Sequence, residues 1–448
     1  MLIKKFFIST ILFLNVYTLF AQISTDTLAD SRWTYHFQST IINDAHAGFK
    51  AKYSGRNSLA DSVETGATTI TGTLFLGRRL WKGAAFYFNP EISGGRGLSG
   101  AQGVAGAVNG ESYRVGIADP RVFIARAYLQ QMFPIGNTTY EYVNDDQNQL
   151  AGRIPAKRLV ISAGKYSIGD FFDDSRYSHD PRTQFLNWSL MGNGAWDYPA
   201  NTRGYTFGLV TELVLKNWSF RIASVAVPKI ANSPDMEYNS HAHSETFEVE
   251  KRWSIRNHPG TFRFIASGTY SRAPSYAEGM QALADHDTTL LYVFSGNAEN
   301  SKFGGKKFGL GYSFDQELSN TIGIFSRFGW NDGKYATWAF TEIDQTVSIG
   351  INVKGNKWNR PDDVFGMATV LNGISKAHRD FLAAGGYGFI IGDGQLNYGH
   401  EGIIETFYNA KLFKNCWLTA DYQFIDNPAY NKDRGPVHVF SGRLHVEF

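Results

Sequence analysis

HVFSGRLHVEF, the stretch His438–Phe448, alternates between two kinds of side chain. One face is mostly apolar and comprises His438, Phe440, Gly442, Leu444, Val446 and Phe448. The other face is mostly polar and comprises Val439, Ser441, Arg443, His445 and Glu447. A period of two is that of a β-strand between two different environments. We predict a transmembrane strand with its apolar face toward lipid and its polar face toward a water-filled lumen. The final Phe448 is similar to the C-terminal signal read by the outer-membrane barrel-assembly machinery.

The N-terminal residues predict export. Lys4 and Lys5 precede an apolar run, Phe6–Phe20, and the small residue Ala21 follows it. A basic start, a short apolar run and a small residue form a secretory signal peptide. The run is short for a transmembrane helix, which needs ~20 residues. We therefore predict that residues 1–21 are a cleaved signal peptide.

Composition favours a β-barrel over a bundle of transmembrane helices. The chain is 15% aromatic and contains 46 Gly, yet its mean hydropathy is −0.27. Barrel walls combine these properties because lipid-facing apolar residues alternate with lumen-facing polar ones. Composition alone does not separate this interpretation from a soluble β-sandwich. The net charge of +2 gives no sign of a nucleic-acid partner.

Short turns between alternating segments predict hairpins along the chain. The expected turns are Trp81-Lys82-Gly83, Lys216-Asn217, Ser319-Asn320 and Lys414-Asn415. In Arg121–Phe133, alternation places Phe123 and Ala127 on one face and Arg126 on the other, although Ile124 does not fit this pattern. We expect an all-β fold, a single antiparallel outer-membrane barrel of about 16 strands, with 18 as the alternative.

No linker divides the remainder, so residues 22–448 are predicted to form one barrel domain. Three stretches break the alternation: Ser93–Gly110, Asp170–Pro199 and Ser375–Ala384, of which the last has a helical pattern. A barrel of this width otherwise encloses an open aqueous lumen. We expect such stretches to fold inward and narrow it.

Two short motifs have better explanations as loops. Gly95–Gly100 matches G-x-G-x-x-G, but the sequence that follows continues as a glycine-rich loop instead of the required helix. His241, His243 and Glu245 are spaced like metal ligands, but no second ligand cluster accompanies them. We predict no metal site and no cofactor.

The segment after Asp170 carries the candidate chemistry of the chain. Acidic residues, including Asp180, are interleaved with basic ones, including Arg182, and Trp188 follows. Carboxylates accept and guanidinium groups donate hydrogen bonds to sugar hydroxyls. A tryptophan adds a flat apolar face on which a pyranose ring can rest. A loop held by its own salt bridges is an equally good interpretation, and the two are compatible.

Several long stretches in order resemble the OprB-type carbohydrate-selective porin family. They are TLFLGRRLW (Thr73–Trp81), FYFNPEISGGRGLSGAQGVAG (Phe86–Gly106), NQLAGR (Asn148–Arg153), SAGKYSIGDFFDDSRYSHDPRTQFLNW (Ser162–Trp188) and NKDRGPVHVFSGRLHVEF (Asn431–Phe448). The resemblance implies a Gram-negative outer-membrane barrel that passes mono- or oligosaccharides passively. It implies a polar constriction with the candidates Glu91, Arg96, Lys165, Asp170, Asp180, Arg182 and Trp188. Strand alternation adds Arg126 to these.

The expected partners are a sugar, outer-membrane lipid and, during biogenesis, the barrel-assembly machinery. The chain is expected to be a monomer or a homotrimer. The main alternative is a barrel enzyme acting on lipid or polysaccharide, whose catalytic groups need not lie close in sequence. An energised uptake receptor is disfavoured, because ~22 strands and a plug need a longer chain.

Overall fold

The final strand of the chain closes the sheet. The computed structural model describes residues 30–112 and 119–448, so the predicted signal peptide, residues 1–21, lies outside the described residues. Strand β20 (Val437–Glu447) pairs antiparallel with β19 (Cys416–Asp426) and with β1 (Trp33–His46). Leu444 lies opposite Leu418 on one side and Ile41 on the other. Because both neighbours are occupied, the sheet has no open edge, as a sheet in lipid requires.

Sixteen strands of the described residues form this closed antiparallel barrel, which confirms the predicted fold class. In order around it they are β1, β2 (Glu64–Arg79), β3 (Ala84–Gly95), β4 (Arg121–Pro134), β7 (Arg158–Tyr166), β8 (Thr206–Val214), β9 (Trp218–Val225), β12 (His243–Ile255), β13 (His258–Ser271), β14 (Gly305–Glu317), β15 (Ile322–Asn331), β16 (Gln345–Gly355), β17 (Arg360–Gly373), β18 (Glu401–Phe413), β19 and β20. Two small ribbons lie outside the wall: β5 (Tyr140–Val143) with β6 (Gly152–Pro155), and β10 (Val227–Pro228) with β11 (Met236–Glu237).

The helices within the described residues are all short. They are α2 (Trp188–Met191), α3 (Tyr276–Asp285), α4 (Thr288–Phe294) and α5 (Lys376–Ala383), with single 3-10 turns at Leu98–Gly100, Ile168–Asp170, Asn356–Trp358 and Pro428–Tyr430. Helix α5 confirms the helical pattern predicted near Ser375–Ala384. Among the residues that the structure describes, no helix is both long enough and apolar enough to cross a membrane.

The two faces of the wall follow the alternation expected from sequence. In β20, Phe440 is 54% exposed on the outer face, whereas Val439 and Arg443 are fully buried inside. Leu444 is also exposed on the outer face and His445 is buried. The burial inside comes from loops that fill much of the lumen, so exposed residues mark the face toward lipid.

One strand departs from the predicted register. In β4, Arg126 pairs with Asn89 but Ile124 pairs with Pro90, so Ala125 is an extra residue in a β-bulge. The bulge reverses the phase of alternation. Val122 and Ile124 therefore face outward, and Phe123 contacts the lumen residue Arg203, whose guanidinium lies 4.2 Å from its ring. The prediction that placed Phe123 on the same face as Ala127 was wrong, and the misfit of Ile124 was the sign of the bulge.

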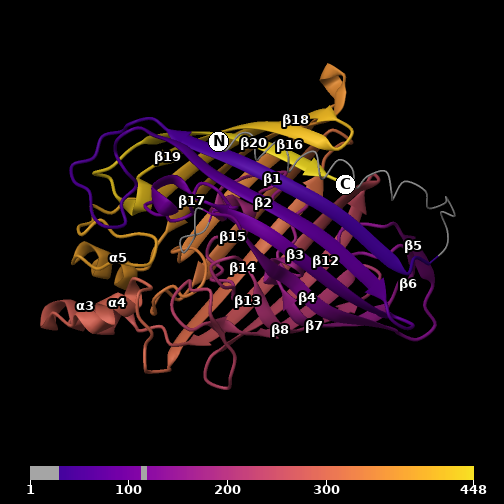
Figure 1. Cartoon of the computed structure of the whole chain (residues 1–448), viewed down its shortest axis with the longest axis horizontal. Coiled ribbons are helices and arrows are strands. Elements are labelled where there is room, and N and C mark those ends of the chain that lie inside the picture. Colours follow the sequence, from indigo (N-terminus) through magenta and orange to yellow (C-terminus); the bar gives the residue numbers. More distant parts are fainter. Residues whose placement is uncertain (1–29, 113–118) are drawn as a thin grey trace.

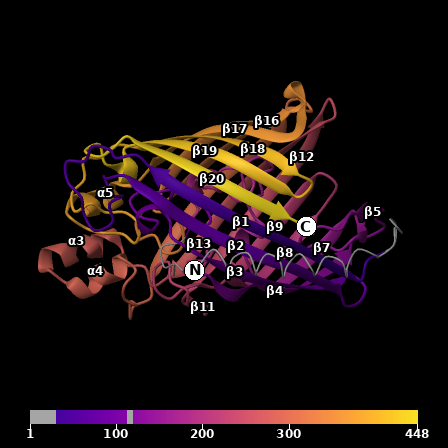
Figure 2. The same cartoon turned by 45° about the horizontal axis from the view of Figure 1, so that its top comes forward.

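Loop length distinguishes the two ends of the barrel. All four predicted turns are confirmed, and they lie at one end; long loops and helices α3, α4 and α5 gather at the other (Figures 1 and 2). In outer-membrane barrels the short turns are periplasmic and the long loops extracellular. We therefore call the end with the short turns the periplasmic end and the end with the long loops the extracellular end. The β5–β6 hairpin is an exception, because it extends the connection between β4 and β7 at the periplasmic end (Figure 1).

Two stretches that break the alternation lie against the inner wall. Leu98 and Val108 of the β3–β4 loop pack with Phe185 and Leu190 of the β7–β8 loop. The wall residues in this cluster are Ala67, Phe325, Ala368, Val370, Ile403, Phe407, Ile425, Val437 and Val439, so it lies mainly against β15 and β17 to β20. A second buried cluster, which includes Phe172 and Trp196 of the β7–β8 loop, lies against β3, β4, β7, β8, β9 and β13. The apolar core of the protein is therefore inside the lumen.

The outward register generates a depth-dependent prediction. Ile349, in the middle of β16, is 59% exposed on the outer face, and Leu418 of β19 faces outward near a periplasmic turn. We expect Ile349→Arg to lower the free energy of unfolding in lipid vesicles by ~2–4 kcal/mol and Leu418→Arg by ~0–1 kcal/mol, because water and head groups solvate the shallower guanidinium. Denaturant titration in vesicles measures both, and equal costs would contradict the assigned depth.

Candidate functional site

The connection between β7 and β8, residues 167–205, enters the lumen and is called the inward loop below. A buried ion pair attaches it to the wall. Nε of Arg327, on β15, lies 3.0 Å from Oδ1 of Asp173, and Nη1 donates to the carbonyl of Leu190 at 2.9 Å. Arg327 is fully buried. One guanidinium group therefore holds both ends of the loop's inner segment.

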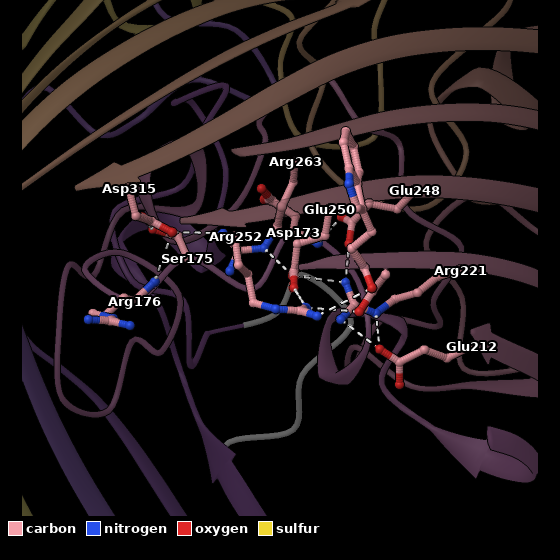
Figure 3. A network of polar contacts seen from close by, with 12 residues as sticks. Asp173, Ser175, Arg176, Glu212, Arg221, Glu248, Glu250, Arg252, Arg263 and Asp315 are labelled. Atoms are coloured by element: carbon pink, nitrogen blue, oxygen red, sulfur yellow. Dashed lines mark hydrogen bonds and ion pairs between the residues drawn. The ribbon is translucent and has the colours of Figure 1, made fainter. Parts of the chain in front are cut away.

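A wider charged network extends from this attachment along β8 to β14 (Figure 3). Glu248 accepts the backbone N–H of Asp173 at 2.8 Å and a bond from Arg221 at 2.6 Å. Arg263 bridges Glu250, at 3.0 Å, and Asp315, at 2.7 Å. The Ser175 hydroxyl donates to Asp315 at 2.6 Å. Every carboxylate here has a guanidinium partner, which buried charges require.

Other wall carboxylates bind loop backbone directly. Glu401 accepts the N–H groups of Ala105, at 2.9 Å, and Ala429, at 2.8 Å. Glu405 accepts those of Leu186 and Asn187. Irregular backbone inside a barrel has unpaired N–H groups, and each buried one left without an acceptor is costly. The carboxylates supply those acceptors in place of water.

Glycines in the wall allow the inward loop to approach closely. A Cβ atom on Gly329 would lie 1.9 Å from Oδ1 of Asn193, and one on Gly311 would lie 2.2 Å from its Nδ2. Asn193 itself donates to the carbonyl of Phe328 at 3.0 Å. Any larger residue at these two wall positions would displace the loop.

Opposite charges converge where the inward loop faces β3. We call Glu91, Glu111, Arg182 and Tyr205 the constriction cluster. The Arg182 guanidinium lies 3.4 Å from a carboxylate oxygen of Glu91 and 3.0 Å from one of Glu111. Glu91 also accepts from the Thr73 hydroxyl at 2.6 Å and from the Tyr205 hydroxyl at 3.0 Å. Burial and the Glu91 carboxylate raise the pKa of Tyr205, so its hydroxyl stays protonated and continues to donate.

Asp180 stabilises the segment of the inward loop that carries Arg182. Its Oδ1 accepts the backbone N–H of Arg182 at 3.0 Å, and its Oδ2 accepts from the Thr183 hydroxyl. Burial alone would raise the pKa of Asp180, but the Arg182 charge and these bonds hold it below its ordinary value. The carboxylate is therefore ionised at neutral pH and fixes the loop that carries Arg182.

Aromatic rings form the facing side of the same pocket. The rings of Trp188 and Phe340 stack with centroids 5.2 Å apart, and Tyr198 packs on Phe340 at 3.9 Å. Trp188 also donates from Nε1 to the carbonyl of Asn109 at 2.9 Å. The pocket between these rings and the constriction cluster has an empty volume of about 570 Å³, which includes space open to solvent. Its polar rim is completed by Ser93, Ser112, Asn201, Thr202, Arg203 and Asn232.

Two further candidates form a pair beside this pocket. Nε and Nη2 of Arg126 each bond an oxygen of Asp170 at 2.6 Å, a bidentate arrangement. The Arg126 guanidinium lies 5.5 Å from the ring centroid of Tyr205. The pair positions Tyr205 and does not line the pocket. The lumen-facing orientation predicted for Arg126 agrees with this placement.

The remaining two candidates lie elsewhere. Arg96 lines a separate pocket at the extracellular end. Lys165, on β7, does not line the constriction pocket, but its ammonium group interacts electrostatically with the lining residues Glu91 and Arg203. The sequence match alone carried no sign of either displacement.

Sequence reasoning missed Glu111, Tyr198, Tyr205 and Phe340. Tyr198 lies within the predicted inward stretch Asp170–Pro199, and Glu111 and Tyr205 lie shortly after such stretches. Phe340 belongs to the β15–β16 loop, far along the chain from Trp188. Only tertiary folding brings those rings together. At the H-x-H-x-E motif, Nε2 of His243 lies 3.6 Å from Glu245, and no group of three or more potential metal ligands occurs in residues 30–112 and 119–448.

Comparison with known proteins identifies this architecture. The model of the carbohydrate-selective porin, OprB family, matches residues 73–448. The chain belongs to this family. It is a carbohydrate-selective porin of the Gram-negative outer membrane, in agreement with the resemblance noted from its sequence.

Solved structures show the same fold at low sequence identity. OprB of Pseudomonas putida, in its high-pH structure, is 14% identical, with a TM-score of 0.66 over 93% of this chain and 94% of that chain. The outer-membrane channel DcaP of Acinetobacter baumannii is 9% identical, with a TM-score of 0.50 over 96% of this chain and 100% of that chain. Among curated proteins no relative matches this chain.

The attachment of the inward loop generates a test. Asp173→Ala leaves Arg327 buried without its carboxylate, which costs about 3–5 kcal/mol in comparable cases. We expect a lower unfolding free energy in vesicles and larger fluctuations of single-channel current, since the loop that narrows the pore is released. Asp174→Ala is the matched control: Asp174 is exposed on the same loop, and its loss is expected to cost less than about 0.5 kcal/mol. Equal behaviour of the two variants would contradict the role of the ion pair.

Proposed function

We propose that sugars pass through the pocket between the constriction cluster and the rings of Trp188, Tyr198 and Phe340. The observation that carries this proposal is the juxtaposition of paired opposite charges with a stacked aromatic surface inside the lumen. Sugar hydroxyls both donate and accept, so they can bond to carboxylates and guanidinium groups in turn. The apolar face of a pyranose ring packs against an aromatic surface.

The paired charges also favour polar solutes over free ions. Glu91 and Glu111 flank Arg182, and Arg203 lies on the same rim. Charges that compensate one another leave no strong net field to attract a free ion of either sign. A polar uncharged solute gains hydrogen bonds without losing a tightly held hydration shell. Passage is then passive diffusion down a gradient.

We further propose that the protein is a channel without a catalytic step. Glu91 and Glu111 are both ion-paired with Arg182. The Arg182 charge also holds the pKa of Asp180 below its ordinary value, which makes this carboxylate poorly suited as a general acid. Turnover of a lipid or polysaccharide by the purified protein, abolished by Glu111→Gln, would support the enzyme alternative instead.

The basic and apolar N-terminal segment and the final Phe448 support a proposal for biogenesis. We propose that the signal peptide is removed after Ala21, that the barrel-assembly machinery inserts the barrel, and that it acts as a monomer or a homotrimer. We expect the protein isolated from outer membranes to have the intact mass of residues 22–448, and native mass spectrometry to give its subunit number. An intact mass that includes residues 1–21 would contradict cleavage.

A neutral substitution in the constriction cluster tests the sugar path. Glu111→Gln keeps the shape of the side chain but replaces a charged acceptor with a neutral one, a loss of ~1 kcal/mol per sugar bond. We expect sugar-induced block of single-channel current to need a roughly 5-fold higher sugar concentration. The channel should also shift toward anion preference because one negative charge is lost.

Glu141→Gln serves as the control for this experiment. Glu141 is exposed in the β5–β6 hairpin outside the barrel wall, so we expect unchanged sugar block. Sugar block that is unaffected by Glu111→Gln but weakened by Glu141→Gln would contradict the assigned path.

A further inference from the structure

A second polar pocket lies among the extracellular loops, apart from the constriction cluster. We call it the outer pocket. It is lined by Arg56, Asn57, Gly95, Arg96, Gly97, Ser99, Gly100, Gln102, Ser295 and Asn297, and it is open to solvent with a volume of about 850 Å³. The glycine-rich motif Gly95–Gly100 forms one side of it. This is the segment whose G-x-G-x-x-G pattern had no nucleotide-binding context.

The outer pocket spans the extracellular opening of the barrel. Arg56 comes from the β1–β2 loop and Arg96 from the β3–β4 loop, whereas Ser295 and Asn297 follow α4 in the β13–β14 loop. Strands β2 and β13 are second and ninth in the order of sixteen described strands, so they lie on nearly opposite sides of the wall. In Figures 1 and 2 these loops gather at the same end. A solute that approaches from outside meets this pocket before the constriction cluster.

The floor of the pocket is held rigidly by hydrogen bonds. Nδ2 of the buried Asn57 donates to the carbonyls of Gly388, at 2.8 Å, and Ile391, at 3.1 Å. Nε2 of Gln102 donates to Oδ1 of Asn57 at 3.2 Å and to the carbonyl of Phe389 at 3.2 Å. Two of these carbonyl partners, Phe389 and Ile391, belong to the apolar core of the extracellular loops. The pocket is therefore preformed.

Its charge differs from that of the other pockets. Arg56 and Arg96 are exposed, and neither guanidinium has an ion pair or hydrogen-bond partner within the described part of the chain. No carboxylate is among its described lining residues. The constriction pocket, by contrast, contains Glu91 and Glu111 beside its arginines, and the periplasmic pockets also combine both signs. Two unpaired cations in a polar pocket favour an anionic ligand.

We propose that the outer pocket binds the carboxylate of acidic sugars, such as uronic acids, and delivers them to the pore. A guanidinium group matches a carboxylate in a bidentate geometry, and two of them on one rim compensate its charge. The side-chain oxygen of Asn297, on the same lining, can accept a hydrogen bond from a ring hydroxyl. The positive opening also attracts anions from a distance and raises their local concentration. The proposal rests on the channel function but not on the constriction cluster.

The influx of two related sugars into proteoliposomes of neutral lipid tests this proposal. Glucuronate and glucose have the same ring and differ at C6, where one carries a carboxylate. We expect Arg56→Gln with Arg96→Gln to lower the influx of glucuronate at low concentration by about 3- to 10-fold and to leave the influx of glucose unchanged. The enhancement in the unaltered protein should disappear as salt rises, because exposed charges are screened.

Arg256→Gln is the matched control, since Arg256 is an exposed arginine in the periplasmic β12–β13 turn. We expect it to change neither flux. The conservative variant Arg56→Lys with Arg96→Lys should retain the salt-dependent part of the enhancement and lose part of the affinity for glucuronate. An effect of Arg256→Gln equal to that of the double variant would overturn the assignment to the outer pocket.

Glucose flux separates this proposal from the channel function. Passage of glucose without any charge-dependent advantage for glucuronate would overturn the outer-pocket proposal and leave the channel intact. Absence of glucose passage would contradict the channel function itself. A lipopolysaccharide phosphate is the other source of an anion here. If lipopolysaccharide added to the vesicles binds in an Arg56- and Arg96-dependent way and glucuronate does not, the ligand is the lipid and the assignment to sugars is wrong.

Discussion

Backbone N–H groups inside a barrel must find acceptors, and this requirement governs the whole interior of the protein. The inward loop and the β3–β4 loop leave the ladder of the sheet, so their amides cannot pair with strands. Glu248, Glu401 and Glu405 on the wall accept them, and Arg327 holds Asp173 from β15. The same device recurs at the extracellular end, where Asp197 accepts the amides of Trp338, Ala339 and Phe340. Without these acceptors the loops could not remain in the lumen.

A lumen filled in this way gives a narrow pore of fixed shape. One apolar cluster, around Phe185 and Phe407, lies mainly against β15 and β17 to β20. A second, around Tyr128 and Phe172, lies against β3, β4, β7, β8, β9 and β13. The polar groups inside the lumen include Arg182, which meets Glu91 and Glu111. A preorganised site selects a solute by hydrogen-bond geometry because its groups do not rearrange around other solutes. Paired charges at the constriction and unpaired arginines at the opening then give the two levels of the pore different electrostatic characters.

The features of the fold that could be predicted are those with a pattern in the local sequence. The alternation in β20 and the turns at Lys216-Asn217 and Ser319-Asn320 are local features, because side-chain direction in a strand has a period of two. The bulge at Ala125 was not predicted, although the misfit of Ile124 marked it. The lumen-facing orientation predicted for Arg126 agrees with the structure, because the bulge at Ala125 precedes Arg126 and does not change the phase of the residues that follow it.

The sequence by itself determined that the chain forms a closed antiparallel wall with an apolar outer face, since lipid on one side and water on the other impose a strict alternation on every strand. It also contained the charged and aromatic residues of the inward loop. Only the tertiary structure decided which of them meet. Phe340 stacks on Trp188, Glu111 contacts Arg182, Arg96 lies with Arg56 in the outer pocket, and Lys165 lies across from Phe207. The reason is that loop contacts in a lumen join segments far apart in the chain, through carboxylates and glycines whose role has no local pattern.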